Sequence, residues 1–226
     1  MKELFAKSGI ILSEERLAQF EQYRSLLLEY NEKFNLTNIT DKDEVTVKHF
    51  IDSVLGGKYI ENCSEIIDIG SGAGFPAIPL AIINNKARFT LLDSLNKRVN
   101  FLNVVIKELN LNNVVAIHRR AEDEGKKSRE KYDCVIARAV ASLPILLEYS
   151  IPLLKVGGIL VAYKGDAEEE IKASGNALKV LGAEIETVDK YKLNGEYNRS
   201  FVIVKKVKKT PEKYPRGQNK PRISPL

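Results

Sequence analysis

The chain has 226 residues, and its 44% hydrophobic content is enough to bury the core of one α/β domain, so a disordered or collagen-like protein is excluded. The net charge is only +5. Its distribution is uneven, because the segment from Lys205 to Leu226 holds eight basic residues and one acid, a charge of +7, which leaves −2 for the rest. A basic end on a slightly acidic body indicates contact with nucleic acid or anionic lipid.

The cysteine and histidine content favours a reduced protein without a metal ion. Cys63 and Cys134 show no pairing pattern, and the two histidines have no carboxylates at metal-binding spacing. Residues 1–15 lack the apolar stretch of a signal peptide, and the most apolar run, Phe75 to Ile83, is broken by two prolines. We therefore expect a metal-free protein of the cytoplasm with no membrane span, and we take a monomer as its expected state.

The first sixty residues are predicted to be helical. Apolar residues recur at three- and four-residue intervals from Leu17 to Tyr30, and Ser13 before them is a good N-cap. A second helix is expected from about Asp41 to Gly56, where a glycine pair favours a helix end. The polar residues Asn35-Leu36-Thr37 connect the two helices. We assign residues 1–60 to an N-terminal helical extension.

After Cys63, short apolar segments alternate with helical ones, which is typical of a parallel sheet covered by helices. Two further β-rich segments are separated by the turn Asn194-Gly195-Glu196 and predict a hairpin. We expect an α/β, Rossmann-like, mostly parallel seven-stranded sheet with an antiparallel terminal hairpin over residues 61–207. The seven strand candidates are Glu65–Ile69, Arg88–Leu92, Val114–Ile117, Asp133–Ala137, Ile159–Tyr163, Glu184–Leu193 and Arg199–Val207.

Residues 208–226, called the tail below, hold four of the eight prolines among lysines and few apolar residues. This composition predicts an extended or disordered segment. The tail is expected to add phosphate contacts that contribute affinity for RNA but little sequence discrimination. The alternative is that it only keeps the protein soluble.

The clearest motif follows the first predicted strand and reads Asp68-Ile69-Gly70-Ser71-Gly72-Ala73-Gly74-Phe75-Pro76. Glycines let a backbone turn tightly and approach a ligand closely, because no Cβ stands in the way. A dinucleotide fingerprint would need its third glycine at the position of Phe75. With Asp68 two places before Gly70, the motif favours a ligand with a cationic end, and S-adenosylmethionine fits. The alternative is a glycine-rich turn without a ligand.

The second predicted strand ends at Asp93-Ser94, nineteen residues after Gly74. A carboxylate there can accept hydrogen bonds from both ribose hydroxyls, as nucleoside-binding α/β folds require. The alternative for Asp93 is a helix N-cap. The loop from Arg119 to Asp123, after the third strand, is a weaker candidate for contact with the adenine edge.

The fourth predicted strand ends in Arg138-Ala139-Val140-Ala141-Ser142. Methyltransferases commonly activate the methyl acceptor by one of two devices, and neither is present here. There is no Asp/Asn-Pro-Pro-aromatic element to polarise an exocyclic amine, and Cys134 lies within the strand, where core packing is the better interpretation. A ring nitrogen such as guanine N7 has a free lone pair and needs neither device. Alignment with the methyl group is then sufficient.

Five segments carry a family resemblance: Asp68–Leu80, Leu91–Arg98, Arg138–Leu143, Asn35–Thr37 and Tyr214–Arg216. Together they resemble the bacterial small-subunit ribosomal RNA guanine-N7 methyltransferases, the glucose-inhibited division protein B family, nearly from end to end. One departure is Ala77, where many members carry glycine, and a single added methyl is not expected to remove activity. The resemblance implies a class I S-adenosylmethionine-dependent methyltransferase fold, that cofactor, and 16S ribosomal RNA or the small subunit as partner.

The resemblance also implies roles for single residues. At the cofactor it places Gly70 and Phe75 against the ligand, Ala121 and Glu122 near adenine, Asp93 and Ser94 at the ribose, and Arg138 at the junction with the acceptor. Candidates for RNA contact are His49, Lys164, Arg199 and Arg216. His49 shares a predicted helix face with Asp52 and Ser53, and Lys164 ends the fifth strand, although ordinary solvated surface is the alternative for both.

Two other classes of function are weighed against this one. A nicotinamide-dependent oxidoreductase is disfavoured because the third glycine stands at 74 and not at 75. A non-catalytic RNA-binding or assembly factor is disfavoured by the intact glycine loop followed by Asp93. No acid or base is assigned, since the expected reaction is a direct in-line displacement that depends on positioning.

Overall fold

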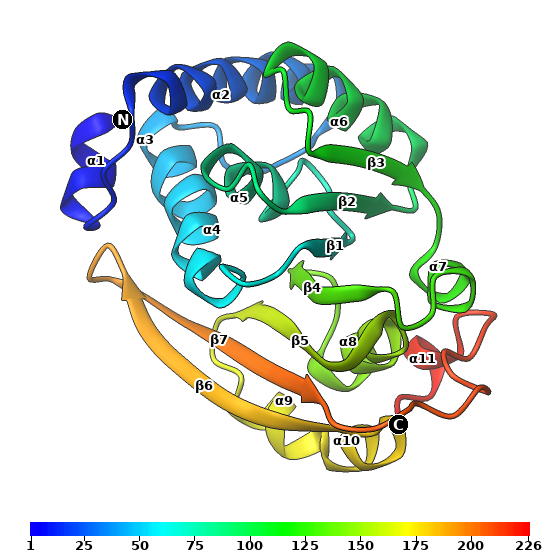
Figure 1. The fold of residues 1–226 in the computed structure, drawn as a ribbon. Coiled ribbons are helices and arrows are strands. Elements are labelled where there is room, and N and C mark those ends of the chain that lie inside the picture. Colours follow the sequence, from blue (N-terminus) through cyan, green and yellow to red (C-terminus); the bar gives the residue numbers. More distant parts are fainter.

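A computed structural model describes all residues, 1–226, and shows one seven-stranded sheet with helices on both faces (Figure 1). The strand order is β3-β2-β1-β4-β5-β7-β6. Strands β1 to β5 are parallel, and β7 runs antiparallel to both β5 and β6. The predicted fold class is therefore confirmed. The strands are β1 (Glu65–Ile69), β2 (Arg88–Asp93), β3 (Val114–His118), β4 (Tyr132–Arg138), β5 (Leu154–Lys164), β6 (Ala183–Leu193) and β7 (Tyr197–Lys206).

Alternation along the strands divides the core into two layers. Ile66 of β1 packs in one cluster, whereas its neighbour Ile67 packs in the other, because successive side chains point to opposite faces. The helices that follow the strands are α5 (Ala77–Ile83), α6 (Asn96–Glu108), α7 (Ala121–Lys127), α8 (Leu143–Ser150), α9 (Glu168–Ala173) and α10 (Gly175–Leu181), with a short 3₁₀ turn, η3 (Ile151–Leu153).

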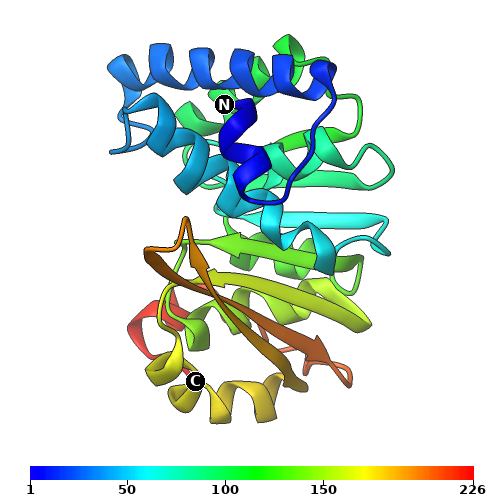
Figure 2. The ribbon, with the colours of Figure 1, turned by 90° about the vertical axis from the view of Figure 1, so that its left-hand side faces the viewer.

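The N-terminal segment begins with α1 (Lys2–Lys7) and α2 (Glu14–Phe34), and Ser13 caps α2 as predicted by accepting from the Arg16 amide. Phe20 and Tyr23 of α2 are fully buried in the same cluster as Ile66. Figure 2 shows α2, in blue, at the opposite end of the molecule from α10, in yellow. The helical extension thus shares its core with the sheet.

The predicted second helix starts at its Asp41 N-cap but changes its hydrogen-bond pattern along its length. It consists of α3 (Lys42–Val45), a π-helical turn η1 (Thr46–Ile51), α4 (Asp52–Leu55) and a 3₁₀ turn η2 (Gly56–Tyr59). A π turn inserts an extra residue and rotates the next part of the helix about its axis, and such turns often occur at functional sites. The apolar periodicity did not predict this turn.

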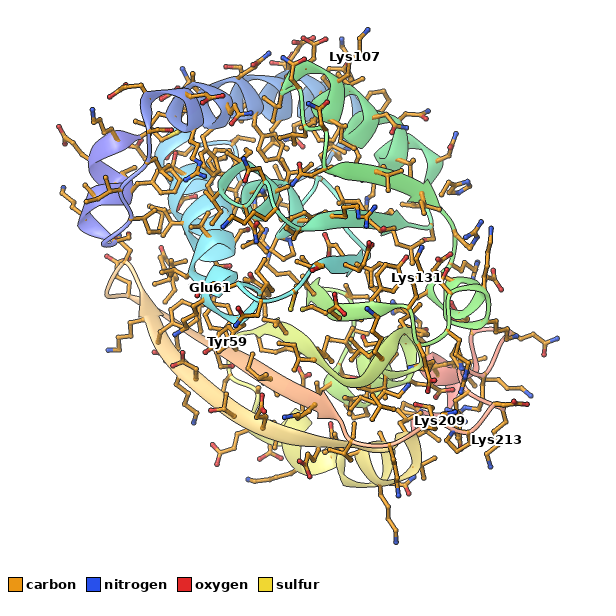
Figure 3. The ribbon with its side chains drawn as sticks, viewed as in Figure 1. Tyr59, Glu61, Lys107, Lys131, Lys209 and Lys213 are labelled. Atoms are coloured by element: carbon orange, nitrogen blue, oxygen red, sulfur yellow. The ribbon has the colours of Figure 1, made fainter.

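The prediction that the tail is extended or disordered is wrong. Thr210 and Tyr214 are 4% and 6% exposed, and residues Lys220–Ile223 form a helical turn, α11. The tail is held mainly by polar contacts: Arg129 of the α7–β4 loop donates to three tail carbonyls, and Arg216 pairs with a buried carboxylate. The prediction was based on the low apolar content of the tail, and that content gives no information about polar contacts of this kind. Lys209 and Lys213 remain at the surface (Figure 3).

None of the helices combines the length and apolarity needed to cross a membrane. No cluster of three or more His, Cys, Asp or Glu side chains has a metal-binding arrangement, and both cysteines are free.

Candidate functional site

The glycine loop leaves β1 at the carboxyl edge of the sheet and is held by β2. The amides of Gly70 and Ser71 donate to the Leu92 carbonyl at 2.7 and 3.1 Å, and the Gly72 amide donates to Oδ2 of Asp93 at 2.9 Å. The carboxyl end of β2 therefore sets the shape of the loop. In open α/β sheets, this edge is where ligands bind.

The three glycines of the loop have different roles, although each has a positive φ. A Cβ on Gly74 would lie 2.6 Å from both the Tyr23 hydroxyl and Ile78, so this glycine makes room for α2 and α5. A Cβ on Gly72 would meet nothing closer than 3.9 Å. Gly72 thus faces open space next to Asp93, whereas Gly74, expected at the cofactor, lies against the core.

Asp93 is 2% exposed, and both of its carboxylate oxygens have protein partners. Oδ1 accepts from the Leu95 amide at 2.9 Å, while Oδ2 accepts from Gly72 and lies 3.4 Å from the Arg98 guanidinium. Asp93 therefore shapes the loop and the turn that leads into α6, but it does not cap that helix, whose N-cap is Leu95. Because a carboxylate can accept about four hydrogen bonds, capacity for ribose hydroxyls remains.

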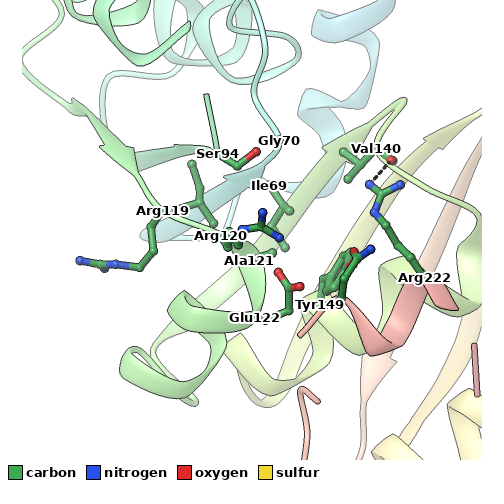
Figure 4. Close-up of a pocket in the computed structure, with 12 residues that line it drawn as sticks. Ile69, Gly70, Ser94, Arg119, Arg120, Ala121, Glu122, Val140, Tyr149 and Arg222 are labelled. Atoms are coloured by element: carbon green, nitrogen blue, oxygen red, sulfur yellow. Dashed lines mark hydrogen bonds between the residues drawn. The ribbon is translucent and has the colours of Figure 1, made fainter. Parts of the chain in front are cut away.

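A first cavity of about 160 Å³ opens beside this loop (Figure 4). Several residues expected at the cofactor line it together, and residues from α8 and the tail complete its wall. The lining consists of Ile69, Gly70, Leu92, Ser94, Arg119, Arg120, Ala121, Glu122, Val140, Tyr149, Asn219 and Arg222. Nucleoside-binding pockets of this fold occupy the same edge of the sheet.

Asp68 carries a buried carboxylate, 1% exposed, and neither of its oxygens has a hydrogen-bond partner. Burial raises the pKa of Asp68 well above its ordinary value, although the nearby Ser71 and Arg138 act in the opposite direction. Asp68 lies behind the glycine loop and lines neither cavity, so a cationic ligand on the loop would act on it through the electrostatic field and not by direct contact. This environment and the open space at Gly72 fit S-adenosylmethionine, whose sulfonium and ammonium groups are cationic.

A second, larger cavity of about 600 Å³ lies at the carboxyl ends of β4 and β5. It brings together His49, Arg138, Lys164 and Arg199, all of which the sequence marked as candidates. Val140 lines both this cavity and the first. The two cavities therefore meet at the residues that follow β4, where Ala139 adopts a left-handed φ of 57°.

Arg138 is the centre of a hydrogen-bond network in the second cavity. Its guanidinium donates to Oδ2 of Asp52 at 3.1 Å, to the Lys48 carbonyl at 3.0 Å and to Nδ1 of His49 at 3.0 Å. It also lies 5.0 Å from the centre of the Phe75 ring. Arg138 therefore joins the π-helical segment to the end of β4.

His49 is held as a neutral imidazole. Because Arg138 donates to Nδ1, Nε2 carries the proton and donates to Oγ1 of Thr37 at 2.8 Å. The ring also stacks on Phe75 with centroids 4.4 Å apart. Burial, followed by the charge of Arg138, lowers the pKa of His49 to about 3. Its companion Ser53 is fully buried and bonds the His49 carbonyl, outside the cavity.

The remaining basic candidates are already engaged with the protein. Lys164 donates to Glu170 at 2.6 Å and to the Ala141 carbonyl at 2.7 Å. Arg199 lies 3.6 Å from Asp52. Arg216 is not in either cavity, since its guanidinium holds Glu148, whose side chain is 1% exposed.

Several residues of the site escaped prediction, among them Glu170 and Lys48 of the second cavity. The Tyr191 hydroxyl donates to Oδ1 of Asp52 at 2.9 Å from the hairpin, and Tyr149, Asn219 and Arg222 line the first cavity. No local motif surrounds Tyr191, so sequence alone offered no signal. The Tyr214-Pro215-Arg216 motif was a signal that the tail has a role, but not that it reaches this cavity.

The fold is similar to those of two solved structures. A TYW2 protein of M. jannaschii in complex with AdoMet has a TM-score of 0.56 at 19% identity, covering 69% of this chain and 77% of that one. An S-adenosylmethionine-dependent methyltransferase of Aquifex aeolicus has a TM-score of 0.55 at 17% identity, covering 75% and 96%. The chain therefore has the class I S-adenosylmethionine-dependent methyltransferase fold, as the sequence predicted.

Sequence comparison identifies the family. Residues 16–202 match the family model GidB, described as rRNA small subunit methyltransferase G. A protein of that name from Thermoanaerobacter sp. is 50% identical over 96% of this chain and 93% of its own length, and one from Streptococcus agalactiae serotype III is 48% identical over 99% and 97%. The chain belongs to the GidB family, which confirms the resemblance, and it is an S-adenosylmethionine-dependent methyltransferase.

Proposed function

We propose that the protein methylates N7 of one guanosine in the 16S ribosomal RNA of the small subunit. The names of its relatives specify a small-subunit rRNA methyltransferase. In this proposal it acts in the cytoplasm as a monomer and without a metal ion. The observation that supports the proposal most directly is the second cavity, called the acceptor cavity below. It adjoins the glycine loop, and His49, Asp52 and Glu170 in it are hydrogen-bonded to other protein groups.

The cofactor is assigned to the first cavity and the adjoining loop. When bound there, S-adenosylmethionine supplies an electrophilic methyl group. Ser94 and Asp93 would hold the ribose side, and Ala121 and Glu122 the adenine side, because these residues lie at the carboxyl ends of β2 and β3. The buried side chain of Asp68, behind the loop, would act on the cationic end electrostatically and without direct contact. Gly70 and Gly72 let the backbone approach the ligand.

The acceptor base is assigned to the second cavity, where the histidine and the carboxylates are hydrogen-bonded to other groups of the protein. His49 has its lone pair occupied by Arg138, and Asp52 has both oxygens bonded. Glu170 accepts from Lys164 and from the Leu143 amide. Guanine N7 offers a lone pair without deprotonation, so positioning of the base is the main requirement. The cationic groups Arg138 and Arg199 would act as donors to guanine O6 or to phosphate.

RNA phosphates are assigned to the end of the β6–β7 hairpin that adjoins this cavity. Lys190 and Lys192 are exposed and lie with Arg199 around a further hollow of about 400 Å³ that shares Gly165 with the acceptor cavity. Neither lysine has an ion-pair partner. Exposed cations beside an acceptor site are suited to hold the backbone of RNA.

The test is to map the methylated atom. Small subunits from a strain lacking the protein are incubated with labelled cofactor, and the RNA is then treated with borohydride and aniline, which cut the chain at N7-methylated guanine. We expect one new scission site in 16S RNA, and none when S-adenosylhomocysteine replaces the cofactor. Incorporated label without scission would place the methyl group on another atom and overturn the N7 proposal.

A further inference from the structure

The tail runs across the molecule from the side where the parallel strands begin to the side where they end, which is the side that holds the site. It starts next to Gly182, whose carbonyl accepts from the Lys208 amide at 3.2 Å, near the amino end of β5. It ends at the carboxyl ends of β1 and β2, where Asn219 and Arg222 line the first cavity together with Ser94. The path therefore runs back toward the glycine loop.

Three anchors fix this path. Arg129 donates to the carbonyls of Tyr214 at 2.6 Å and Pro211 at 3.0 Å. Pro215 packs against Gly125 of α7, where an added Cβ would lie 2.8 Å from the proline ring. Arg216 binds Glu148 of α8 through its backbone amide, Nε and Nη2. The tail is thereby wedged between α7 and α8, the two helices that border the first cavity.

Beyond these anchors, Arg222 reaches the cavity itself. Its Nη2 donates to the Val140 carbonyl at 3.1 Å, and Figure 4 shows its side chain next to Tyr149, across from Glu122. Arg216 also donates to the Ser224 carbonyl at 2.8 Å, which holds the turn of α11 in place. Arg222 is thus positioned by backbone contacts, although its side chain faces an open cavity.

We propose that the tail forms the outer wall of the adenosine pocket and that Arg222 is a cofactor-positioning residue. A guanidinium presents only donors and a flat face, which suit the acceptor nitrogens and the ring plane of adenine. The carboxylate of Glu122, on the other side, suits the exocyclic amine. The inference rests on the proposed position of the cofactor in the first cavity.

The first test is cofactor affinity without RNA, measured by calorimetry on the full chain. Arg222→Ala should weaken S-adenosylmethionine binding about five-fold, the value of one net hydrogen bond. Lys220→Ala is the matched control, because it removes the same charge from the same helical turn at a residue that does not line the cavity. It should bind like the wild type.

The outcomes separate the two proposals. If the wild type binds and the two variants bind equally well, the role of the tail is overturned and the proposed function stands. If the wild type itself does not bind S-adenosylmethionine, both are overturned. Thermal unfolding of each variant without cofactor should match the wild type, which distinguishes a lost contact from a lost fold.

The second test is protection from trypsin, read by mass spectrometry. Bound S-adenosylmethionine should slow cleavage after Arg222 and Arg216 several-fold, because the ligand holds the wall closed. Cleavage after Lys86, in the loop between α5 and β2 at the amino edge of the sheet, is the internal control and should not change. Equal rates at the tail with and without saturating cofactor would overturn the proposal.

Discussion

His49 illustrates how one residue of the acceptor cavity depends on its surroundings. Its pKa is lowered to about 3, whereas an unfolded chain has the ordinary value of about 6.5. Between these values, the unfolded state binds a proton that the folded state does not. The stability linked to His49 is therefore complete above pH 6.5 and is lost as the pH falls toward 3.

This linkage predicts the behaviour of His49→Gln. Between pH 6.5 and 4.5, the wild type should lose about 2 kcal/mol of unfolding free energy that the variant does not lose. Urea denaturation of both proteins at the two pH values measures the difference. Parallel losses would show that His49 already titrates normally in the folded protein.

The glycine loop allows a second prediction, because Gly72 and Gly74 differ in what surrounds them. Gly74→Ala should destabilise the protein by about 3 kcal/mol or more, since the new methyl meets Tyr23 and Ile78 at 2.6 Å and φ is +102°. Gly72→Ala should cost about 1 kcal/mol, because only the positive φ opposes it.

The matched pair should also separate stability from binding. Gly72→Ala places a methyl at the open ligand side and should weaken S-adenosylmethionine binding in folded protein, as calorimetry would measure. Equal destabilisation of the two variants in thermal melts would contradict the assignment of Gly74 to the core.

For single residues, the sequence predicted only those neighbours that lie within the same short segment of the chain. The order of Asp68, the glycines and Asp93 follows from a single strand–loop–strand unit, so its position beside a cavity was predictable. The partners of Asp52 were not, because Arg138 and Tyr191 are 86 and 139 residues away in the chain. Which side chains meet across such separations depends on the packed fold.

Among the elements, the seven strands were predicted closely, whereas the segment 42–59 was not. Buried parallel strands are short apolar runs between turn signals, and this pattern is local. A π turn has no comparable signature. It positions His49 and Asp52 toward Arg138 while Ser53 turns into the core, so the expected common face of the three residues is only partly present.

The tail anchor supports a third prediction. Arg216→Ala removes the guanidinium from the carboxylate of Glu148, 1% exposed, and leaves it only the backbone amide of residue 216, which should destabilise the protein by about 3 kcal/mol. Lys172→Ala removes a solvent-exposed ion pair to Glu169 and should cost well under 1 kcal/mol. Urea midpoints of both variants measure the contrast. A loss for Arg216→Ala no larger than for Lys172→Ala would show that the tail is not held by this pair.

Over the whole molecule, the structure changes the meaning of the basic segment from Lys205 to Leu226, which consists of the end of β7 and the tail. Lys206 is fully buried against Glu130, and Arg216 is paired with Glu148. Lys208 and Lys209 lie near Gly182, at the edge of the sheet opposite the site. Charge counted along the sequence therefore overstates what the tail offers to RNA. The hairpin lysines lie nearer to the acceptor cavity.

Salt dependence of RNA binding tests this distribution. Replacing Lys190 and Lys192 together by Gln should reduce the slope of log affinity against log salt by about 1.5, since each lost phosphate contact contributes about 0.7 to 0.9. Replacing Lys208 and Lys209 together by Gln is the charge-matched control and should leave the slope nearly unchanged. Filter binding over a salt series would measure both slopes. A larger change of slope for the Lys208 and Lys209 variant than for the Lys190 and Lys192 variant would assign the phosphate contacts to the tail.

The Asp52–Tyr191 hydrogen bond has a consequence for how the protein folds. It joins residues 139 positions apart, and the bond from Arg222 to Val140 spans 82. Closing such long loops costs entropy that the packing of the whole fold must offset. Each cavity therefore draws its residues from distant parts of the chain, and neither can be complete in a protein that has folded only in part.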